Sequence, residues 1–397
     1  MIEHKFYLGD ALEVLKNIPD RSIHCCITSP PYWGLRDYGI NGQLGMEETL
    51  EGYVTSMVRV FREVMRVLRP DGTLWLNLGD SYTGNNSRSS YGGRAGFGTP
   101  REKLVNRTGD NLKPKNLVGI PWRVALALQE DGWYLRSDII WHKPNCMPSS
   151  VTDRPTTSHE YVFLLSKSRQ YFYDAEAIKE DSVDPEGSSQ RYKYKFSGRE
   201  GLIMPNGKPQ QIAVKGKRGF NIKRNKRTVW TVPTQPFSGS HFAVFPPKLI
   251  EPMILAGTSP KACEICGAPW ERVIEKKTRP HPNRWSGKND ARQFNTSENK
   301  YGMGGGLGVA HISMTVSWQP TCKCDNKGTG RCVVLDPFGG SGTVSMVAKK
   351  LGRASMYIDI NPEYVKMAIS RCNFQQGGLF ETHTYRLEGL NDRATAF

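Results

Sequence analysis

Apolar residues over the first 143 positions of the chain follow two alternating spacings. Short apolar runs with β-branched residues predict strands at residues 4–9, 23–29, 73–78 and 134–143. Apolar residues three and four positions apart predict helices at residues 10–18, 50–68 and 120–132. The helix at 50–68 is predicted to end at the turn sequence Arg69–Gly72. Strands that alternate with helices indicate an α/β fold around a mostly parallel sheet.

This alternation stops after residue 143 and returns near the C-terminus. Residues 84–99, rich in Gly, Ser and Asn, predict a loop, and residues 332–372 carry the order strand, glycine-rich turn, helix, strand, helix. The chain therefore divides into five predicted parts. These are one half of an α/β domain at 1–143, a basic recognition region at 144–240, a helix returning to that domain at 241–257, a cysteine-bearing insertion at 258–330 and the second half of the domain at 331–397.

The positive charge of the chain indicates a polyanionic partner. The 397 residues carry a formal net charge of +16, and between Arg191 and Arg227 there are twelve Lys or Arg against one acidic residue. Aromatic residues alternate with these cations, which favours a nucleic-acid surface over a solvated basic loop, because rings stack on bases while cations bind phosphates. The predicted nucleic-acid contacts are Lys193, Lys195, Arg199, Lys215, Lys217, Arg218, Lys223, Arg224, Lys226 and Arg227.

Hydropathy predicts neither a membrane span nor secretion. No apolar run approaches the roughly 20 residues that a spanning helix needs. The N-terminal sequence lacks the apolar stretch and the cleavage site of a secretion signal. The nine cysteines are an odd number, which argues against a disulfide framework. These features predict a cytoplasmic protein.

The C-terminal half carries a nucleotide-binding pattern. Gly339, Gly340 and Gly342 lie between a predicted strand and a predicted helix, and Asp359 ends the next strand. A carboxylate at that position can accept hydrogen bonds from both ribose hydroxyls. The loop lacks the glycine spacing of a dinucleotide site and the Gly-Lys-Ser/Thr of a P-loop, so a nucleoside without a pyrophosphate is favoured, with S-adenosylmethionine as the candidate. The alternative is a purely structural turn between strand and helix.

Two motifs at opposite ends of the chain resemble one enzyme family. The sequences "TSPPYW" and "DPFGGSGT" are similar to those of the DNA amino-methyltransferases, which methylate cytosine N4 or adenine N6. The catalytic motif precedes the cofactor motif here, which resembles the permuted β group. The resemblance implies a Rossmann-like class I methyltransferase fold with a seven-stranded, circularly permuted sheet. Residues 1–143 would then be the catalytic half and 331–397 the cofactor-binding half.

The resemblance also implies roles for individual residues. The catalytic corner would be Ser29, Pro30, Pro31 and Tyr32. Ser29 and the Pro30 carbonyl would accept the two amine hydrogens, and Tyr32 would stack on a base flipped out of the duplex, because the target atom is unreachable inside the helix. S-adenosylmethionine would be bound by Asp10, Asp336, Pro337, Phe338, Gly339, Gly340, Gly342, Thr343 and Asp359. Asp10 before a helix is equally explained as an N-cap. Trp33 is predicted to pack in the core.

The serine of the catalytic corner favours cytosine. In this family Ser-Pro-Pro-Tyr is commoner in N4-cytosine enzymes and Asp-Pro-Pro-Tyr in N6-adenine enzymes, but either side chain can accept a hydrogen bond from an amine. An N6-adenine enzyme is therefore the second hypothesis. RNA and protein-glutamine methylation stay open, as does a DNA-binding protein with an inactive methyltransferase fold. The implied partners are double-stranded DNA and a cognate restriction endonuclease, in a bacterial, archaeal or phage-encoded monomer or homodimer.

Four cysteines in two close pairs predict a structural metal site. Cysteine pairs of this kind suit tetrahedral zinc of the ribbon type, which leaves no open position for catalysis. Unligated thiols are the alternative reading, and Cys332 and His311 are substitute ligands, although Cys332 begins an apolar strand. The predicted zinc ligands are Cys263, Cys266, Cys322 and Cys324.

Overall fold

The computed structural model describes residues 2–34, 40, 42–83, 112–182, 220–221, 223–235, 245–280, 309–373 and 383–389. Contacts within the chain divide it into two units. Unit 1 comprises residues 1–177, 227–271 and 320–397, and unit 2 comprises residues 178–226 and 272–319. None of the helices in the described ranges combines the length and the apolar character that a membrane span requires. The predicted loop at 84–99 lies outside the described residues.

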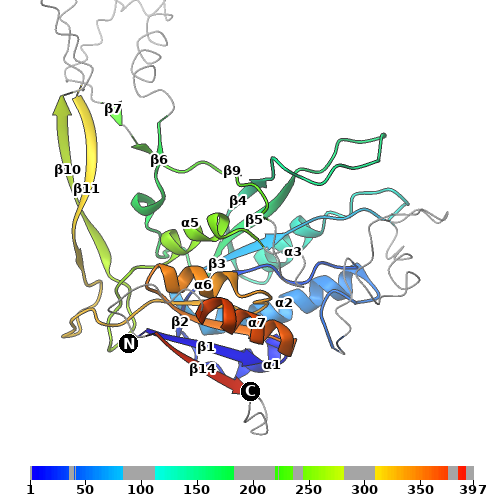
Figure 1. Ribbon diagram of the computed structural model, residues 1–397, viewed down its shortest axis with the longest axis horizontal. Helices are drawn as coiled ribbons and strands as arrows, with labels where there is room; N and C mark the ends of the chain where they lie inside the picture. The colour runs from blue at the N-terminus through cyan, green and yellow to red at the C-terminus, as the bar shows by residue number, and fades with distance from the viewer. Residues whose placement is uncertain are drawn as a thin grey trace, which may run out of the picture. The chain divides into compact units, whose positions relative to one another are not determined.

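A nine-stranded sheet forms the centre of unit 1 (Figure 1). In spatial order its strands are β14 (His383–Gly389), β1 (Ile2–Leu8), β13 (Ala354–Asp359), β12 (Val333–Asp336), β2 (Ile23–Thr28), β3 (Leu68–Leu78), β5 (His159–Ser166), β4 (Tyr134–His142) and β9 (Val229–Thr231). All neighbours are parallel except β5, which is antiparallel to both β3 and β4. The predicted α/β class is confirmed, and β14 and β9 each add an edge strand to the predicted seven.

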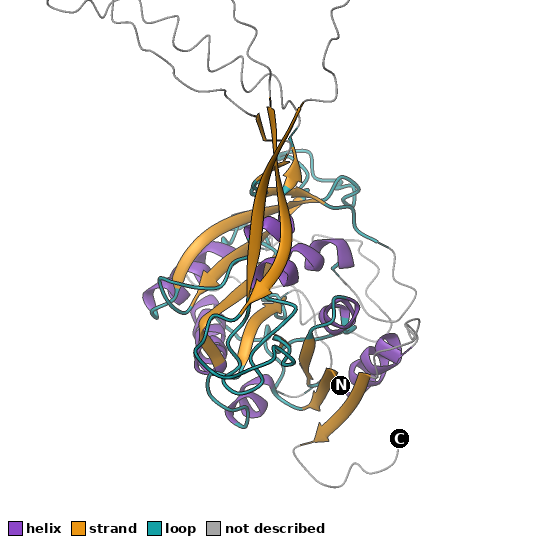
Figure 2. Ribbon diagram, turned by 90° about the vertical axis from the view of Figure 1, so that its left-hand side faces the viewer, coloured by secondary structure: helices purple, strands orange, loops and turns teal. Residues whose placement is uncertain are grey.

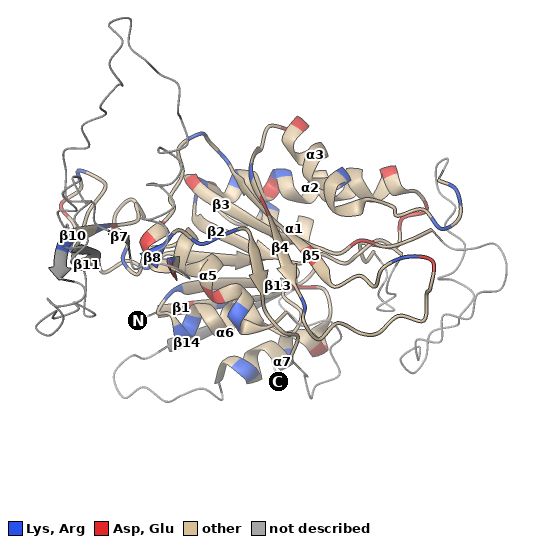
Figure 3. Ribbon diagram, turned by 90° about the horizontal axis from the view of Figure 1, so that it is seen from above, with Lys and Arg blue, Asp and Glu red and all other residues tan. Residues whose placement is uncertain are grey.

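Helices cover both faces of this sheet, so unit 1 has three layers (Figure 3). On one face lie α1 (Ala11–Lys16), α2 (Leu50–Val67) and α3 (Ile120–Glu130). On the other face lie α5 (Pro247–Gly257), α6 (Thr343–Lys350) and α7 (Pro362–Asn373). A short 3₁₀ helix, η1, spans Ala175–Ile178. The predicted helices are therefore present, with ends that differ by a few residues.

The pattern of α2 shows why these helices form where they do. The hydroxyl of Thr49 accepts a hydrogen bond from Gly52 N at 3.0 Å, which caps the first turn. Apolar residues from Leu50 to Val67 recur at three- and four-residue spacing, and seven of them are buried against the sheet. Burial of each such side chain stabilises the fold by about 1.5–3 kcal/mol, so packing rather than propensity holds the helix.

The turn predicted at Arg69–Gly72 is part of strand β3 instead. Between Ile23 and Cys25 the register against β3 shifts from Leu68 to Thr73, so the intervening residues bulge out of the ladder. Their carbonyl groups are satisfied by residues that follow β5. Ser168 Oγ donates to Pro70 O at 2.7 Å and Phe172 N donates to Asp71 O at 2.9 Å. Long-range hydrogen bonds therefore extend the strand through a sequence that favours a turn.

Two strands of the sheet come from the range assigned to the recognition region. Strand β5 contains the apolar run Val162–Leu165, which is buried between β3 and β4. Strand β9 places Trp230 against Trp75, with ring centroids 6.2 Å apart. The prediction missed these strands because residues 144–240 were assigned as a whole from their basic composition. The apolar run Val162–Leu165 is itself typical of a buried strand.

Unit 2 consists of short strands and one long strand pair. Strands β6 (Glu180–Asp181) and β8 (Lys223–Arg224) pair antiparallel, and a three-stranded sheet has the order β10 (Glu271–Pro280), β11 (Val309–Gln319), β7 (Phe220–Asn221). Of the ten predicted nucleic-acid contacts, Lys223, Arg224, Lys226 and Arg227 lie in the described residues, and the other six lie outside them. Arg224 forms an ion pair with Glu180 at 2.9 Å.

Candidate active site

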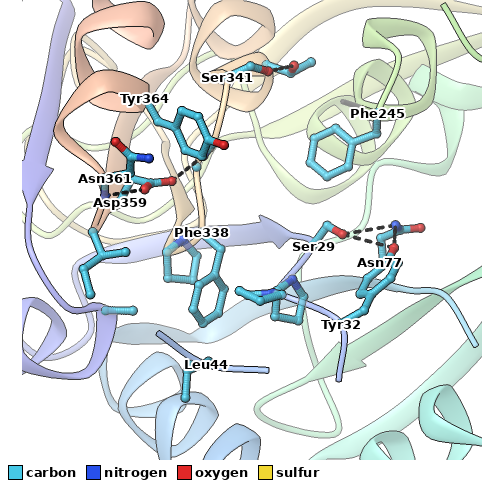
Figure 4. Close-up of a pocket in the computed structure, with 18 of the residues that line it drawn as sticks. Ser29, Tyr32, Leu44, Asn77, Phe245, Phe338, Ser341, Asp359, Asn361 and Tyr364 are labelled. Atoms are coloured by element: carbon cyan, nitrogen blue, oxygen red, sulfur yellow. Dashed lines mark hydrogen bonds between the residues drawn. The ribbon is translucent and has the colours of Figure 1, made fainter. Parts of the chain in front are cut away.

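A cavity of about 390 Å³ lies where the carboxyl ends of the parallel strands meet. Ligands bind at this edge in open α/β sheets because the loops there leave a crevice above the strand ends. The cavity wall includes Asp10, the whole corner from Ser29 to Tyr32, Pro337 to Gly340, Thr343 and Asp359 (Figure 4). The fold thus brings together two motifs that are about 300 residues apart. Asp336 and Gly342 are not among the lining residues.

Asp336 joins the two motifs beneath the cavity. Its side chain is buried and accepts hydrogen bonds from Thr28 Oγ1 at 2.8 Å and from Phe338 N at 3.2 Å. Thr28 is the last residue of β2, directly before the catalytic corner, and Phe338 begins the glycine turn. Burial raises the pKa of Asp336 to about 7, because a charged carboxylate is disfavoured away from water. The position of one motif is therefore fixed relative to the other.

Asp359 holds the glycine turn through its carboxylate. One oxygen accepts from Gly340 N at 2.8 Å, and the other accepts from Asn361 N at 2.8 Å. Burial raises the pKa of Asp359 to about 6, against these two hydrogen bonds, which lower it. A Cβ atom at Gly339 would lie 2.1 Å from the Tyr357 ring. The glycine at 339 is therefore required by the packing of the protein itself, in addition to any approach of a ligand.

Asp10 occupies the wall of the cavity as a helix cap. Its side chain accepts a hydrogen bond from Glu13 N at 3.1 Å, so the N-cap interpretation is confirmed. The preceding Gly9 N donates to Asp359 O at 3.0 Å, which ties the end of β1 to the end of β13. Asp10 and Asp359 therefore line one cavity from neighbouring strand ends, and the Asp10 carboxylate keeps lone pairs beyond the one that caps the helix.

Hydrogen bonds to neighbouring segments fix the corner formed by Ser29 to Tyr32. Tyr53 Oη, on helix α2, donates to Pro31 O at 3.0 Å. Trp33 is buried and its Nε1 donates to Glu47 O at 2.9 Å, so the prediction that Trp33 packs in the core is confirmed. The prolines supply no N–H group that could compete for these acceptors. The Pro30 carbonyl is consequently part of a fixed backbone.

A hydrogen-bond network connects the corner to Asn77 and Glu160, which sequence reasoning missed. Figure 4 shows the part of it formed by Ser29, Tyr32 and Asn77. Ser29 Oγ donates to Tyr32 Oη at 3.3 Å, and Tyr32 Oη donates to Glu160 Oε2 at 2.9 Å. Asn77 Nδ2 lies 3.3 Å from Ser29 Oγ and 2.9 Å from both Tyr32 Oη and Glu160 Oε2. Burial, and next the nearby Glu160 carboxylate, raise the pKa of Tyr32 well above its ordinary value, so the phenol stays protonated.

The missed residues sit at strand ends that converge on the same edge. Asn77 is near the end of β3, Lys143 directly follows β4, and Glu160 is the second residue of the antiparallel β5. Lys143 forms an ion pair with Glu160, and its Nζ lies 4.2 Å from the centroid of the Trp141 ring. The sequence does contain one signal for Glu160, which stands beside the apolar run Val162–Leu165. A charged residue next to a buried strand needs a partner, so its position indicates a polar site.

The comparisons with known proteins agree with this geometry. Residues 23–263 and 329–370 match the model of a family described as DNA methylase. The chain belongs to this family. It is thus a DNA methyltransferase of the N4/N6 amino-methyltransferase class, as its motifs predict.

Two similar relatives match nearly the whole length of the methyltransferase. The Type II methyltransferase M.Cfr9I of Citrobacter freundii is 39% identical over 370 residues, covering 91% of this chain and 85% of the relative. The Type II methyltransferase M.SmaI of Serratia marcescens is 37% identical over 377 residues, covering 92% and 90%. The fold resembles that of PvuII DNA methyltransferase (cytosine-N4-specific), with a TM-score of 0.50, 17% identity, and coverage of 95% and 89%.

The four predicted zinc ligands of the methyltransferase form one cluster. The sulfur atoms of Cys263, Cys266, Cys322 and Cys324 all lie within 4.8 Å of one another. Four thiolates at a Zn–S distance of about 2.3 Å would be separated by roughly 3.8 Å in a tetrahedron, so small shifts accommodate the ion. Cys332 is buried directly before β12, and the side chain of His311 lies outside the described part of the chain.

Backbone hydrogen bonds shape the first cysteine pair as a metal-binding turn. Ile265 N and Cys266 N each donate to Cys263 Sγ at 3.4 Å, and Gly267 N donates to Cys263 O at 2.9 Å. Gly267 has φ +71°, a conformation that glycine adopts at little cost. The turn therefore presents the Cys263 sulfur to N–H donors that stabilise a thiolate.

A buried histidine attaches this turn to the central sheet. His24 Nδ1 accepts from Val333 N at 3.0 Å, so Nε2 carries the proton and donates to Gly267 O at 2.7 Å. Burial lowers the pKa of His24 to about 4, and the ring stays neutral. Because His24 is on β2 and Val333 on β12, the cysteine turn rests on the two strands that carry the catalytic and cofactor motifs.

Proposed function

We propose that the enzyme transfers the methyl group of S-adenosylmethionine to the exocyclic N4 of a cytosine flipped out of duplex DNA. The observation that carries this proposal is the cavity shared by the Ser-Pro-Pro-Tyr corner and the glycine turn with Asp359. The serine favours cytosine over adenine by family resemblance. Adenine N6 is the second candidate, since Ser29 would accept equally from that amine.

The chemistry of the cavity fits a nucleoside cofactor. The Asp359 carboxylate accepts two backbone N–H groups, and its remaining lone pairs are available to ribose hydroxyls. Asp10 and Phe338 also line this part of the wall, and provide a polar and an aromatic surface for the adenine. When bound, S-adenosylmethionine supplies an electrophilic methyl group on a positively charged sulfur.

The corner would activate the amine by accepting its hydrogens. A serine hydroxyl has one hydrogen and two lone pairs. The Ser29 hydrogen is directed to Tyr32, one lone pair faces Asn77, and the other is available to an amine hydrogen. The Pro30 carbonyl would accept the second hydrogen. Localising the nitrogen lone pair in this way makes it nucleophilic, and the rigid corner directs it toward the methyl group.

The network also offers the departing proton a route. Methyl transfer forms an N–C bond, breaks the S–C bond and leaves an amine proton to be removed. Ser29 Oγ is in reach of that proton, and Tyr32 continues the chain to the Glu160 carboxylate. Lys143 forms an ion pair with that carboxylate.

Cofactor affinity should depend on pH through Asp359. Below a pKa of about 6 the carboxyl becomes protonated and loses acceptor capacity toward ribose. We expect the Kd for S-adenosylmethionine, measured by calorimetry, to be about tenfold higher at pH 5 than at pH 7. Because burial raises the pKa of both Asp359 and Asp336, their protonation stabilises the folded state as pH falls, so these two groups would not cause unfolding.

The variant Asp359→Asn separates this effect from the titration of Asp336. It should bind weakly at every pH and show a flat profile between pH 5 and 7. A wild-type affinity that does not change over this range would contradict the assignment of Asp359 to ribose binding.

For the cysteine cluster we propose a structural zinc ion. Elemental analysis should find one equivalent of zinc per chain, and the double variant Cys263→Ser/Cys266→Ser should lose it. Because the metal ties two distant segments together, we expect the variant to unfold at a temperature lower by on the order of 5 °C. The matched control is Cys146→Ser, a partly exposed cysteine outside the cluster. A metal-free wild-type chain with unchanged stability would contradict the proposal.

Methyl transfer itself tests the proposed function. The purified protein is incubated with radiolabelled S-adenosylmethionine and either unmethylated duplex DNA, RNA of the same sequence, or a protein extract. Label in the DNA alone is the expected result. Label in RNA or protein would overturn the substrate, and cofactor binding without any transfer would favour a DNA-binding protein with an inactive fold.

A further inference from the structure

Unit 2 is assembled from two segments that are distant in sequence. One, residues 178–226, lies inside the basic region predicted at 144–240, and the other, residues 272–319, lies inside the cysteine-bearing insertion. Strands β7 and β11 join them, since Phe220 pairs with Ala310 and Asn221 with His311 in a parallel ladder. Residues 272–319 of the insertion therefore form one unit with residues 178–226 of the predicted recognition region, although the two regions were predicted to be separate.

Most of the net positive charge of the protein is in this unit. Its two segments contain 20 Lys and Arg against 8 Asp and Glu, a net formal charge of +12 out of the +16 of the whole chain. Unit 1, with about three quarters of the residues, carries only the remaining +4. Unit 2 has the stronger attraction for a polyanion, because affinity for DNA grows with the number of phosphates neutralised.

Strands β10 and β11 form a long exposed ribbon (Figure 2). No residue of either strand whose exposure is described is buried, and Met314 and Val316 are 41% and 54% exposed. A ribbon of two strands is marginally stable by its own packing in water. The two strands are held at one place by Arg272, which lies over the Trp318 ring at 4.6 Å and donates to Thr315 Oγ1.

The ribbon has the dimensions and the charge to enter the major groove. A two-stranded ribbon fits this groove, which is about 12 Å wide. Ten residues of β10 extend roughly 33 Å, about one turn of duplex DNA. Arg272, Lys276 and Lys277 lie along β10, and Lys276 and Lys277 are exposed. The first strand begins five residues after Cys266 and the second ends three residues before Cys322, so the zinc cluster would tie both strands at their base.

We propose that the β10–β11 ribbon is a DNA-binding arm whose Arg272, Lys276 and Lys277 contact phosphates. The proposal rests on the proposed function, in that duplex DNA is the substrate. It adds a second DNA-contacting element, outside the basic stretch between Arg191 and Arg227.

The test compares two triple variants of the full-length protein. Arg272→Ala/Lys276→Ala/Lys277→Ala removes the cations of the ribbon. Its matched control, Lys16→Ala/Lys350→Ala/Lys366→Ala, removes three exposed cations from helices of unit 1. Affinity for an unmethylated duplex is measured by fluorescence anisotropy at several salt concentrations. Three lost phosphate contacts should lower the slope of log K against log salt by about 2.7. The control should keep the wild-type slope.

The outcomes separate this proposal from the proposed function. If the wild-type protein methylates DNA but the ribbon variant keeps the slope and affinity of the control, the arm is overturned while the methyltransferase stands. If the wild-type protein transfers no methyl group to DNA, the proposed function itself fails. Tighter binding of the wild-type protein to double-stranded RNA than to duplex DNA would also overturn the proposal. Should the ribbon variant fold poorly, a photocrosslinking residue at position 276 must crosslink to DNA, and absence of the crosslink contradicts the arm.

Discussion

Replacement of Ser29 by alanine should lower kcat by about 10²- to 10³-fold, the cost typical of removing one transition-state hydrogen bond. In the proposed mechanism Ser29 Oγ accepts an amine hydrogen, and in the structure it links Asn77 and Tyr32. The variant should bind S-adenosylmethionine with wild-type affinity, because the predicted cofactor contacts lie elsewhere on the cavity wall. Single-turnover kinetics with saturating DNA and cofactor measure the chemical step directly.

The matched control for this experiment is Ser22→Ala. Ser22 is outside the cavity and its hydroxyl donates to Pro19 O at 2.7 Å, so the control should keep full activity. If Ser29→Ala retained more than about a tenth of the wild-type kcat, Ser29 would not be the principal acceptor of the amine hydrogen. In that case the Pro30 carbonyl would have to provide the activation alone.

Replacement of Gly342 by alanine should destabilise the fold by about 2–5 kcal/mol and abolish cofactor binding. Gly342 has φ +75°, which costs an alanine about 1–2 kcal/mol. The new Cβ would also lie 2.6 Å from Ala368 Cβ on helix α7, and such overpacking costs about 1–3 kcal/mol. Relief of this clash would move the glycine turn and Thr343. Chemical denaturation measures the first effect and calorimetry the second.

Gly352 provides a control with the same backbone but an open environment. Its φ is +70°, and a Cβ atom added there would have no heavy atom within 4 Å among the described residues, its chain neighbours aside. Gly352→Ala should therefore cost only the backbone strain and leave cofactor binding intact. In the double variant Gly342→Ala/Ala368→Gly the shortest contact, 2.6 Å to Ala368 Cβ, is removed, while the approach of 2.9 Å to the Cα at position 368 stays. Its destabilisation should therefore be smaller than the sum of the single variants. Equal effects at positions 342 and 352 would contradict the packing argument.

The two motifs could be predicted from the sequence because each is a short local pattern. Ser29–Tyr32 and Gly339–Gly342 keep their spacing whatever the rest of the chain does, and both contribute residues to one cavity. The reason for the glycines was harder to predict. Tyr357 and Ala368 approach Gly339 and Gly342 only after the strands and helices have packed, so the sequence shows the glycines without the side chains that exclude a Cβ.

Asn77, Lys143 and Glu160 could not be assigned in this way because their network comes from three different strands. The local sequence offers only the charge of Glu160 beside an apolar run and does not show its partners. The antiparallel direction of β5 is what brings Glu160 to the cavity. The pairing of β7 with β11 has the same origin. About ninety residues separate these strands, and no local pattern specifies a partner at that distance.

The identity of the methylated nucleoside tests the central claim most directly. Unmethylated duplex DNA is incubated with the enzyme and S-adenosylmethionine, digested to nucleosides, and analysed by mass spectrometry beside the Ser29→Ala variant. The account predicts N4-methylcytosine with the wild-type enzyme and a strongly reduced amount with the variant. N6-methyladenine in its place would contradict the assignment of cytosine as the target base.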